Sequence, residues 1–298
     1  MSIVVGVDPA HRSASALHLA AMLARSTGTD LIVAAVVPPA WPTTAGGADA
    51  EWRGYTRDNA DGALDHAAAV LGGSIAAEYL LHEAPSARRG LVELAEQREA
   101  SMIVVGSAVD GQPGRIALGS ASDTLLHASP VPVAIAPRGY RTEEGSRVSR
   151  VTAAYRGTGA STPLVLGAAG VAAAAGADLR VASFAVVPRD SGTSGAGLDA
   201  EQPIADTWAA DVEKHAASLV RQVTELPDAP DVTGVAVGRG ESWESALADI
   251  GWEPDEVLVV GSSTLGPIAR VFLGSHAAKI LRHSPVPVVV VPHGLAER

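Results

Sequence analysis

The chain contains no cysteine, which excludes disulfide bonds, thiolate metal sites and cysteine nucleophiles. Lysine is nearly absent as well, because only Lys214 and Lys279 occur in 298 residues. With a formal net charge of −11, the chain also lacks the basic excess that nucleic acids and anionic membranes attract. These shortages argue against a nucleic-acid-binding or membrane-surface protein.

Long apolar runs are missing too. No stretch reaches the roughly 18 apolar residues that cross a bilayer. The opening MSIVVGVDP has no basic region before its short apolar run, unlike an export signal. We therefore expect a soluble cytoplasmic protein. There is no Gly-x-Ser-x-Gly elbow, no lysine-bearing phosphate loop and no His-Glu-x-x-His helix, so we expect no efficient enzyme, no catalytic residue and no metal site.

What the chain does contain is an internal repeat. Residues 101–137 and 256–292 align without a gap at a spacing of 155 and share 16 of 37 residues. The identities fall on a glycine-containing loop, a helix start and a final SPVPV segment. Two copies of one unit therefore make up the chain.

Each unit alternates short β-branched runs with longer Ala- and Leu-rich amphipathic stretches. The predicted strands are Ile3–Val7, Leu31–Val37, Ala76–Leu81, Met102–Val105 and Val133–Ala136, then Val151–Tyr155, Leu179–Val187, Val232–Val237, Val257–Val260 and Val288–Val291. The predicted helices are Ser13–Ser26, Asp49–Leu71, Pro85–Glu99 and Ser120–His127, then Thr162–Ala175, Asp206–Thr224, Ser242–Ile250 and Ser275–Arg282.

This alternation predicts an α/β fold with two doubly wound, Rossmann-like domains, each with a five-stranded, mainly parallel sheet. We expect the first domain over residues 1–137, a polar linker over 138–147 and the second domain over 148–298. Ligands of such sheets lie beyond the carboxyl ends of the strands, so Asp8, Val36–Pro38 and Gly106–Gly119 are the segments to watch.

The glycine loop follows the fourth strand of each unit. It starts at Gly106 and Gly261, and it leads to the Gly119-Ser120 and Gly274-Ser275 helix starts. Glycine lets a backbone approach a phosphate closely, and a helix start offers unpaired N–H groups. The alternative is that glycine marks a turn and serine caps the helix, with no ligand involved.

The VVGS strand end, the spacing between Gly106 and the Gly119-Ser-x-Ser helix start, the SPVPV strand and the opening VGVD together resemble the universal stress protein family in its tandem two-domain form. The resemblance covers nearly the whole chain. It implies five-stranded parallel domains of Rossmann-like type. One branch of that family binds ATP and another does not.

Carried over residue by residue, the resemblance implies an adenine-nucleotide site in the first unit, with Mg²⁺ bound only together with the nucleotide. Asp8 matches the family's contact to the adenosine ribose and base, and Val36 matches a backbone contact to adenine. The remaining matches are the strand-end pair Val105 and Gly106 and the phosphate contacts Gly119, Ser120, Ala121 and Ser122.

Both units depart from the family pattern. Its second glycine is Val109 here, whose Cβ could crowd the phosphates or require a backbone angle that valine avoids, unless Gly111 relaxes the loop. In the second unit Arg156 stands where the first has Asp8, Thr264 replaces the glycine and Ala277 the last serine. Only Gly261, Gly274 and Ser275 remain, so we expect the nucleotide in the first unit.

Two features stay open from sequence alone. Arg115 and Arg270 occupy equivalent positions in the two units. Each is either a functional cation, near the phosphates or at a contact between the domains, or a solvated side chain. The wide loop Pro38–Asp61 carries Trp41, Trp52 and Tyr55, which cover a ligand or pack on the helix beneath. Its counterpart Arg189–Gln202 has no aromatic residue.

The last strand of each unit is apolar and needs a partner, because an exposed apolar edge aggregates. In the family these strands pair antiparallel across a dimer interface. We therefore expect an intrachain pseudo-dimer, with a homodimer of chains as a further option. The function expected is a stress-response ATP-binding sensor or switch. The alternatives are a protein-interaction scaffold that binds no nucleotide and a slow ATP hydrolase.

Overall fold

The computed structural model describes residues 1–39, 47–157, 161–186, 198–262 and 274–292. The first half contains β1 (Ser2–Val7), α1 (Ser15–Thr27), β2 (Asp30–Val37), α2 (Gly47–Leu71), β3 (Ala77–Glu83), α3 (Ala87–Gln97), β4 (Met102–Gly106), α4 (Ser120–Leu125) and β5 (Val133–Ala136). The second half contains β6 (Arg150–Ala154), α5 (Thr162–Ala175), β7 (Asp178–Val186), α6 (Leu198–Thr224), β8 (Val232–Gly240), α7 (Trp243–Asp249), β9 (Glu256–Gly261), α8 (Ser275–His283) and β10 (Val288–Val291).

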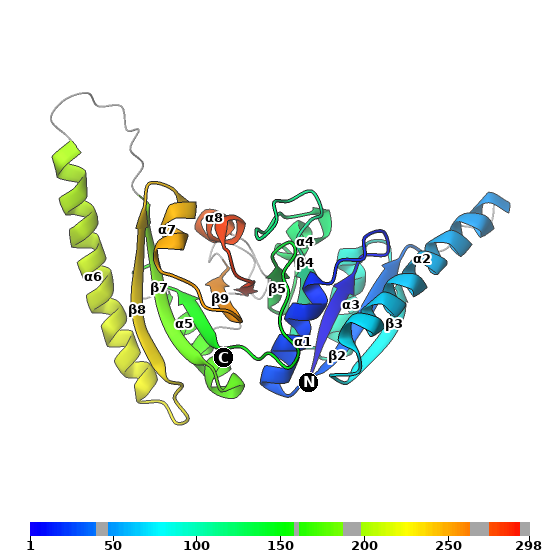
Figure 1. Cartoon of the computed structure of the whole chain (residues 1–298), viewed down its shortest axis with the longest axis horizontal. Coiled ribbons are helices and arrows are strands. Elements are labelled where there is room, and N and C mark those ends of the chain that lie inside the picture. Colours follow the sequence, from blue (N-terminus) through cyan, green and yellow to red (C-terminus); the bar gives the residue numbers. More distant parts are fainter. Residues whose placement is uncertain (40–46, 158–160, 187–197, 263–273, 293–298) are drawn as a thin grey trace.

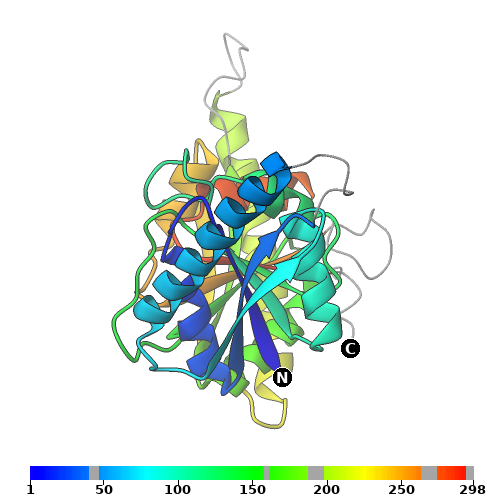
Figure 2. The ribbon, with the colours of Figure 1, turned by 90° about the vertical axis from the view of Figure 1, so that its right-hand side faces the viewer.

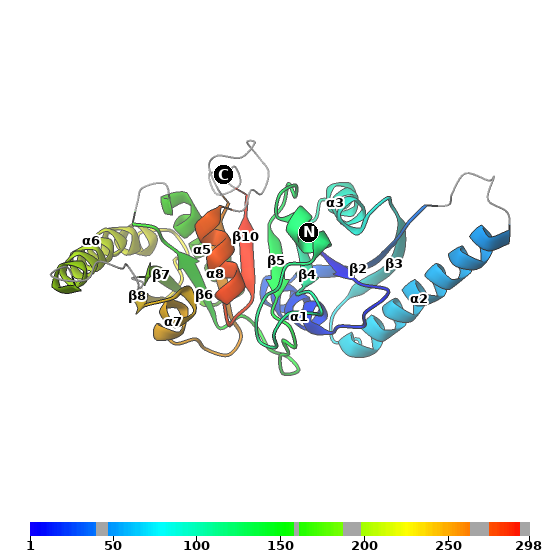
Figure 3. The ribbon, with the colours of Figure 1, turned by 90° about the horizontal axis from the view of Figure 1, so that it is seen from above.

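The predicted α/β class and the alternation of elements are confirmed. All strands join one sheet in the order β3-β2-β1-β4-β5-β10-β9-β6-β7-β8, rather than two separate sheets (Figure 1). Within each half the strands are parallel. Across the middle, β5 and β10 pair antiparallel, with Val133 opposite Val290 and Ile135 opposite Val288. Seen from above, these two strands lie at the centre of the molecule (Figure 3).

Helices cover both faces of this sheet. One apolar cluster unites α1, α2, α5 and α6 with the strands, and a second unites α3, α4, α7 and α8. Each cluster includes buried residues of both halves, such as Met22 and Ala169 in the first and Leu125 and Leu281 in the second. The sheet and both helical layers are therefore continuous from one half to the other. Figure 2, which faces the first half, shows α2 lying across the twisted strands.

Two helices are longer than the sequence predicts. The helix expected over Asp49–Leu71 begins two residues earlier, at Gly47, so the overlapping expectation of a loop over Pro38–Asp61 is wrong for residues 47–61. Trp52 and Tyr55 therefore lie on a helix, and Trp41 lies outside the described residues. Likewise α6 begins at Leu198, so residues 198–202 are helical although Pro203 follows them, and residues 187–197 lie outside the described part.

The polar linker is fastened to α1. The Arg25 Nη1 donates a hydrogen bond to the Ser146 carbonyl at 2.7 Å, and the Val148 N–H donates to Ser26 Oγ at 2.8 Å. Tyr140 is half-buried and its hydroxyl lies 3.4 Å from Met22 Sδ. Burial raises the pKa of Tyr140, and the charge of Asp255 in the second half adds to the effect. The linker thus belongs to the packed structure.

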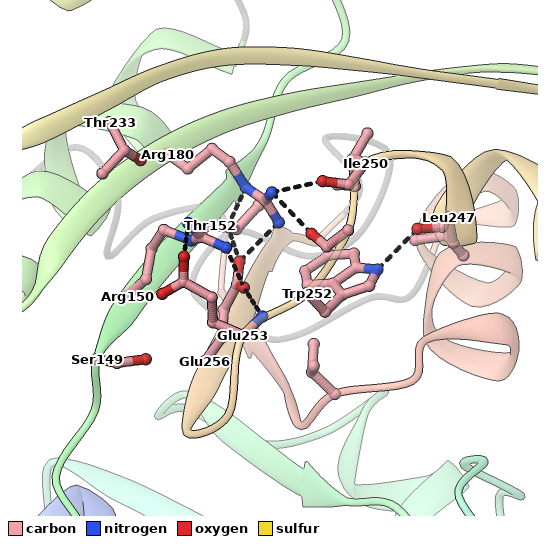
Figure 4. Close-up of polar contacts among 12 residues, drawn as sticks. Ser149, Arg150, Thr152, Arg180, Thr233, Leu247, Ile250, Trp252, Glu253 and Glu256 are labelled. Atoms are coloured by element: carbon pink, nitrogen blue, oxygen red, sulfur yellow. Dashed lines mark hydrogen bonds and ion pairs between the residues drawn. The ribbon is translucent and has the colours of Figure 1, made fainter.

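A buried charge cluster lies in the second half, where β6, β7 and β9 run side by side (Figure 4). The Glu256 carboxylate is fully buried and accepts hydrogen bonds from Arg180 Nη2 at 2.7 Å and Arg150 Nη2 at 2.8 Å. Thr152 Oγ1 also donates to it. The Arg180 guanidinium lies 4.9 Å from the Trp252 ring centre. The equivalent first-half positions hold Ser2, Val4, Ile32 and Ser101, so the cluster belongs to one half alone.

Candidate functional site

A cavity of about 590 Å³ opens at the carboxyl ends of β1, β2 and β4. It lies where the strand order reverses, since β1 has β2 on one side and β4 on the other. This is the topological switch point at which open α/β sheets bind their ligands. The volume is within the roughly 300–1,000 Å³ typical of small-molecule sites.

The cavity brings together residues that are far apart in the chain. All eight first-half residues that the sequence singled out line it, namely Asp8, Val36, Val105, Gly106, Gly119, Ser120, Ala121 and Ser122. Further lining residues that the sequence did not single out include His11, Ala87 and Leu91. Strand ends supply the first four predicted residues, and the start of α4 supplies the last four.

Asp8 follows β1 and presents a carboxylate that remains more than half exposed, at 59%. Its Oδ1 accepts a hydrogen bond from the Ala10 N–H at 2.9 Å, and its Oδ2 lies 3.0 Å from His11 Nδ1. These contacts hold the carboxylate in place while leaving acceptor capacity for a ligand hydroxyl. His11 was missed from sequence, although its spacing of three residues from Asp8 was visible.

The loop after β4 closes on itself. Ser107 Oγ accepts a hydrogen bond from the Ala117 N–H at 2.8 Å, and the Ala108 N–H donates to the Ala117 carbonyl at 2.9 Å. Gly111 lies inside this ring, where an added Cβ would meet Ala117 Cβ at 2.6 Å. The glycine is therefore required for the close approach of the two loop arms.

Val109 lies on this loop, lines the cavity and is 46% exposed. The expectation that it needs an unfavourable backbone angle is wrong. Among the described residues other than glycine, positive φ occurs at Glu99, Asp228 and Asp255 and not at Val109. Valine is accommodated without strain, and what it changes is the shape of the cavity wall.

At the start of α4, one backbone N–H is already bound by a side chain of the helix itself. The Gly119 N–H donates to Ser122 Oγ at 2.9 Å, so this hydroxyl, expected to contact phosphate, caps the helix instead. The first bond inside the helix runs from the Asp123 N–H to the Gly119 carbonyl at 2.9 Å. The N–H groups of Ser120 and Ala121 precede that bond, so they have no partner within the helix, and both residues line the cavity.

The charges that line the cavity are Asp8, Asp110 and the ionisable His11, and no lysine or arginine is among its lining residues. Arg115, one of the two arginines left open from sequence, pairs with Glu244 of the second half at 2.7 Å. Of the alternatives left open for Arg115, the structure therefore shows the contact between the two halves. Arg270 lies outside the described residues.

The equivalent region of the second half differs. Gly261 ends β9, Gly274 precedes α8 and Ser275 begins it, while Thr264 lies outside the described residues. Two residues that align with cavity-lining alanines of the first half, Ala87 and Ala121, are Trp243 and His276 here.

The Trp243 and His276 rings meet edge to face, with their centres 5.7 Å apart. Lys279 Nζ lies 5.9 Å from the Trp243 ring centre. Burial lowers the pKa of His276, and the charges of Arg156 and Lys279 lower it further. Aromatic and cationic side chains thus occupy the region where the first half has small residues and a carboxylate.

Trp52 and Tyr55 are not among the residues that line the first-half cavity. They are 44% and 67% exposed on α2, so the interpretation of these two as a cover for a ligand is not supported.

In the described part of the chain, no three His, Asp or Glu side chains gather where they could hold a metal ion. None of the described helices combines the length and apolarity needed to cross a membrane.

Known proteins resemble the chain over its full length. The profile of the universal stress protein family matches residues 1–137 and again residues 148–292. A universal stress protein of Mycobacterium tuberculosis strain H37Rv is 37% identical over 298 residues, which cover 98% of this chain and 100% of that protein. One of Mycolicibacterium smegmatis is 26% identical over 299 residues, covering 97% of this chain and 96% of that protein.

Among solved structures, a universal stress protein from Archaeoglobus fulgidus gives a TM-score of 0.60 at 19% identity, covering 98% of both chains. A putative universal stress protein from Pseudomonas aeruginosa gives 0.58 at 15% identity, covering 100% of this chain and 98% of the other. At these identities the likeness is one of fold.

Proposed function

The chain belongs to the universal stress protein family as two such domains in tandem, and from that premise we propose that its first half binds an adenine nucleotide and acts as a stress-response sensor or switch. The observation that carries the proposal is the cavity at the switch point of the sheet. It is lined by every first-half residue that the resemblance assigns to nucleotide binding.

In the proposed pose, the adenine lies against Val36 and the ribose hydroxyls donate to Asp8. The phosphate end faces Gly106 and the N–H groups of Ser120 and Ala121. ATP is the ligand that the family resemblance implies, with Mg²⁺ accompanying it. The apolar walls would exclude water from the base, and the exposed carboxylate of Asp8 would fix its orientation.

The second half takes a different part in the proposal. Its Trp243 and His276 rings stand where small residues line the first cavity, and Arg156 replaces the acidic contact. We therefore propose that it binds no nucleotide in this manner and pairs with the first half as an intrachain pseudo-dimer. The antiparallel β5–β10 contact supports that pairing. The same proposal places the domain limits at 1–137 and 148–298. It also includes a cytoplasmic location and a homodimer of chains.

The test is equilibrium binding of adenine nucleotides to the full chain by calorimetry. We expect Asp8→Ala to weaken binding by about tenfold or more, because it removes charge-assisted hydrogen bonds worth roughly 1.5–3 kcal/mol. Gly119→Ala should also weaken binding without unfolding the protein. Gly119 has the extended angles φ −87 and ψ 174, and its added Cβ would meet Ala108 Cβ at an ordinary 3.5 Å.

Gly274→Ala, the equivalent change in the second half, is the matched control and should leave the affinity unchanged. Affinity weaker than millimolar, or unaffected by both first-half variants, would contradict the proposal and leave the scaffold function. Phosphate release from ATP that is abolished by Asp8→Ala or Gly119→Ala would point to the slow hydrolase. Release that survives both variants would come from a contaminant.

A further inference from the structure

We infer that the first-half cavity favours an adenine nucleotide with a single phosphate group over ATP. The inference rests on the proposed function and names the ligand class more narrowly. It follows from the charge and shape of the cavity wall beyond the position of the first phosphate, and from two neighbouring arginines whose side chains bind other partners.

The first step concerns charge. A polyphosphate is normally held by lysine or arginine, which form the strongest hydrogen bonds to phosphate oxygens. None of the residues lining this cavity is of either type. Residues 40–46, which follow β2, have the sequence AWPTTAG and contain no basic residue.

The nearby arginines lie outside the cavity lining. The exposed Arg12 extends toward α2, where its Nη2 lies 2.8 Å from the position that a Cβ on Gly62 would take. Arg115 pairs with Glu244, and the Arg138 Nη1 donates to the Gly111 carbonyl on the loop. The cavity therefore has Asp8 and Asp110 as its fixed charges, and both repel phosphate.

The second step concerns shape. Val109 and Asp110 lie on the loop that the Ala108–Ala117 hydrogen bonds close, so the loop presents both residues to the cavity. Val109 takes the place of the family's glycine. A second and third phosphate extending from the Gly119 end would run past the Val109 side chain and toward the Asp110 carboxylate.

The third step concerns the donors that remain. Ser122 Oγ and the Gly119 N–H already bond to each other. The N–H groups of Ser120 and Ala121, with the Ser120 hydroxyl, can serve one phosphate group. Further phosphates would meet a neighbouring carboxylate, and two like charges about 4 Å apart in water change an equilibrium constant by roughly fivefold.

The experiment is calorimetric titration of the full chain with adenosine, AMP and ATP in EDTA, and then with ATP and Mg²⁺. We expect AMP to bind at least about fivefold more tightly than ATP in EDTA. Mg²⁺ should reduce the difference between the affinities for AMP and ATP, because it neutralises phosphate charge. Asp110→Asn and Val109→Gly should each raise the affinity for ATP several-fold more than the affinity for AMP.

Asp58→Asn is the matched control, since it removes the same charge from an exposed position on α2 outside the cavity. It should change neither affinity. If ATP in EDTA binds as tightly as AMP, or if the Val109 and Asp110 variants change both affinities equally, the inference is overturned while the proposed function stands. If no nucleotide binds, both are overturned.

Discussion

Arg115 Nη2 of the first half lies 2.7 Å from Glu244 Oε1 of the second half. Arg115 belongs to the loop whose ring of hydrogen bonds borders the cavity, and Glu244 lies in the first turn of α7, directly after Trp243. The pair therefore joins the candidate nucleotide loop of one half to the aromatic region of the other. It adds a side-chain contact to the β5–β10 strand pairing.

The Arg115 guanidinium holds the pKa of Glu244 below its ordinary value of 4.5, mainly through their hydrogen bond. The contribution of the pair to stability is therefore present above about pH 4.5 and is lost as the pH falls through the lower folded-state pKa. We predict that Arg115→Ala returns the Glu244 pKa to the ordinary range, as measured by NMR titration of the carboxyl carbon. Arg57→Ala, which breaks the exposed pair with Glu83, should leave it unchanged. An unaltered Glu244 titration in Arg115→Ala would refute this link between the halves.

A second prediction concerns the contact of α7 with β8. A Cβ on Gly238 would lie 2.1 Å from the Ala246 carbonyl oxygen, so the helix lies against the bare backbone of the strand. Gly238→Ala must push α7 away, and we expect a loss of about 2 kcal/mol or more in unfolding free energy. Gly170→Ala is the control, because Gly170 is an exposed position of α5 whose added Cβ meets nothing within 4 Å, and the change should stabilise by up to ~1 kcal/mol. Urea unfolding measures both. Equal stability of Gly238→Ala and the wild type would refute the packing argument.

The strand and helix pattern was predictable because burial on both sides of a parallel sheet forces apolar strands between amphipathic helices. The start of α2 was predicted to within two residues, whereas the start of α6 was not. Pro203 suggests a helix that begins after it, but α6 begins at Leu198. The first turns of α6 could not be read from local propensity.

The candidate site shows the same division. Motif positions predicted which residues line the cavity, because each lies at a strand end or a helix start. The capping of Gly119 by Ser122 and the contact of Asp8 with His11 depend on side-chain directions that no motif states. The Trp243–His276 pair had a visible signal, since these residues align with small residues of the first unit. Their contact became evident only when α7 and α8 were placed side by side.

A third prediction tests the buried cluster around Glu256. Glu256→Gln would leave the buried Arg180 without its paired carboxylate and Arg150 with Glu253 as its remaining carboxylate, and breaking a buried pair in this way costs about 3–5 kcal/mol. Glu253→Gln is the matched control. It contacts the same Arg150 at 2.7 Å but is 54% exposed, so the change should cost less than about 1 kcal/mol. Chemical unfolding of both variants compares them directly. Similar losses in the two would show that burial does not govern the strength of this cluster.

The last prediction concerns pH and His18 on α1. Burial lowers the pKa of His18 from 6.5, and the charges of Arg141 and Arg25 lower it further. Because the unfolded chain binds the proton first, stability is full above pH 6.5 and declines as the pH falls toward the lower folded-state pKa. We expect the thermal midpoint to fall across this window and His18→Gln to flatten the decline. His215→Gln, an exposed histidine on α6, should leave the slope unchanged. If His18→Gln and the wild type lose stability with the same slope, burial and the neighbouring arginine charges do not disfavour the protonated imidazole of His18.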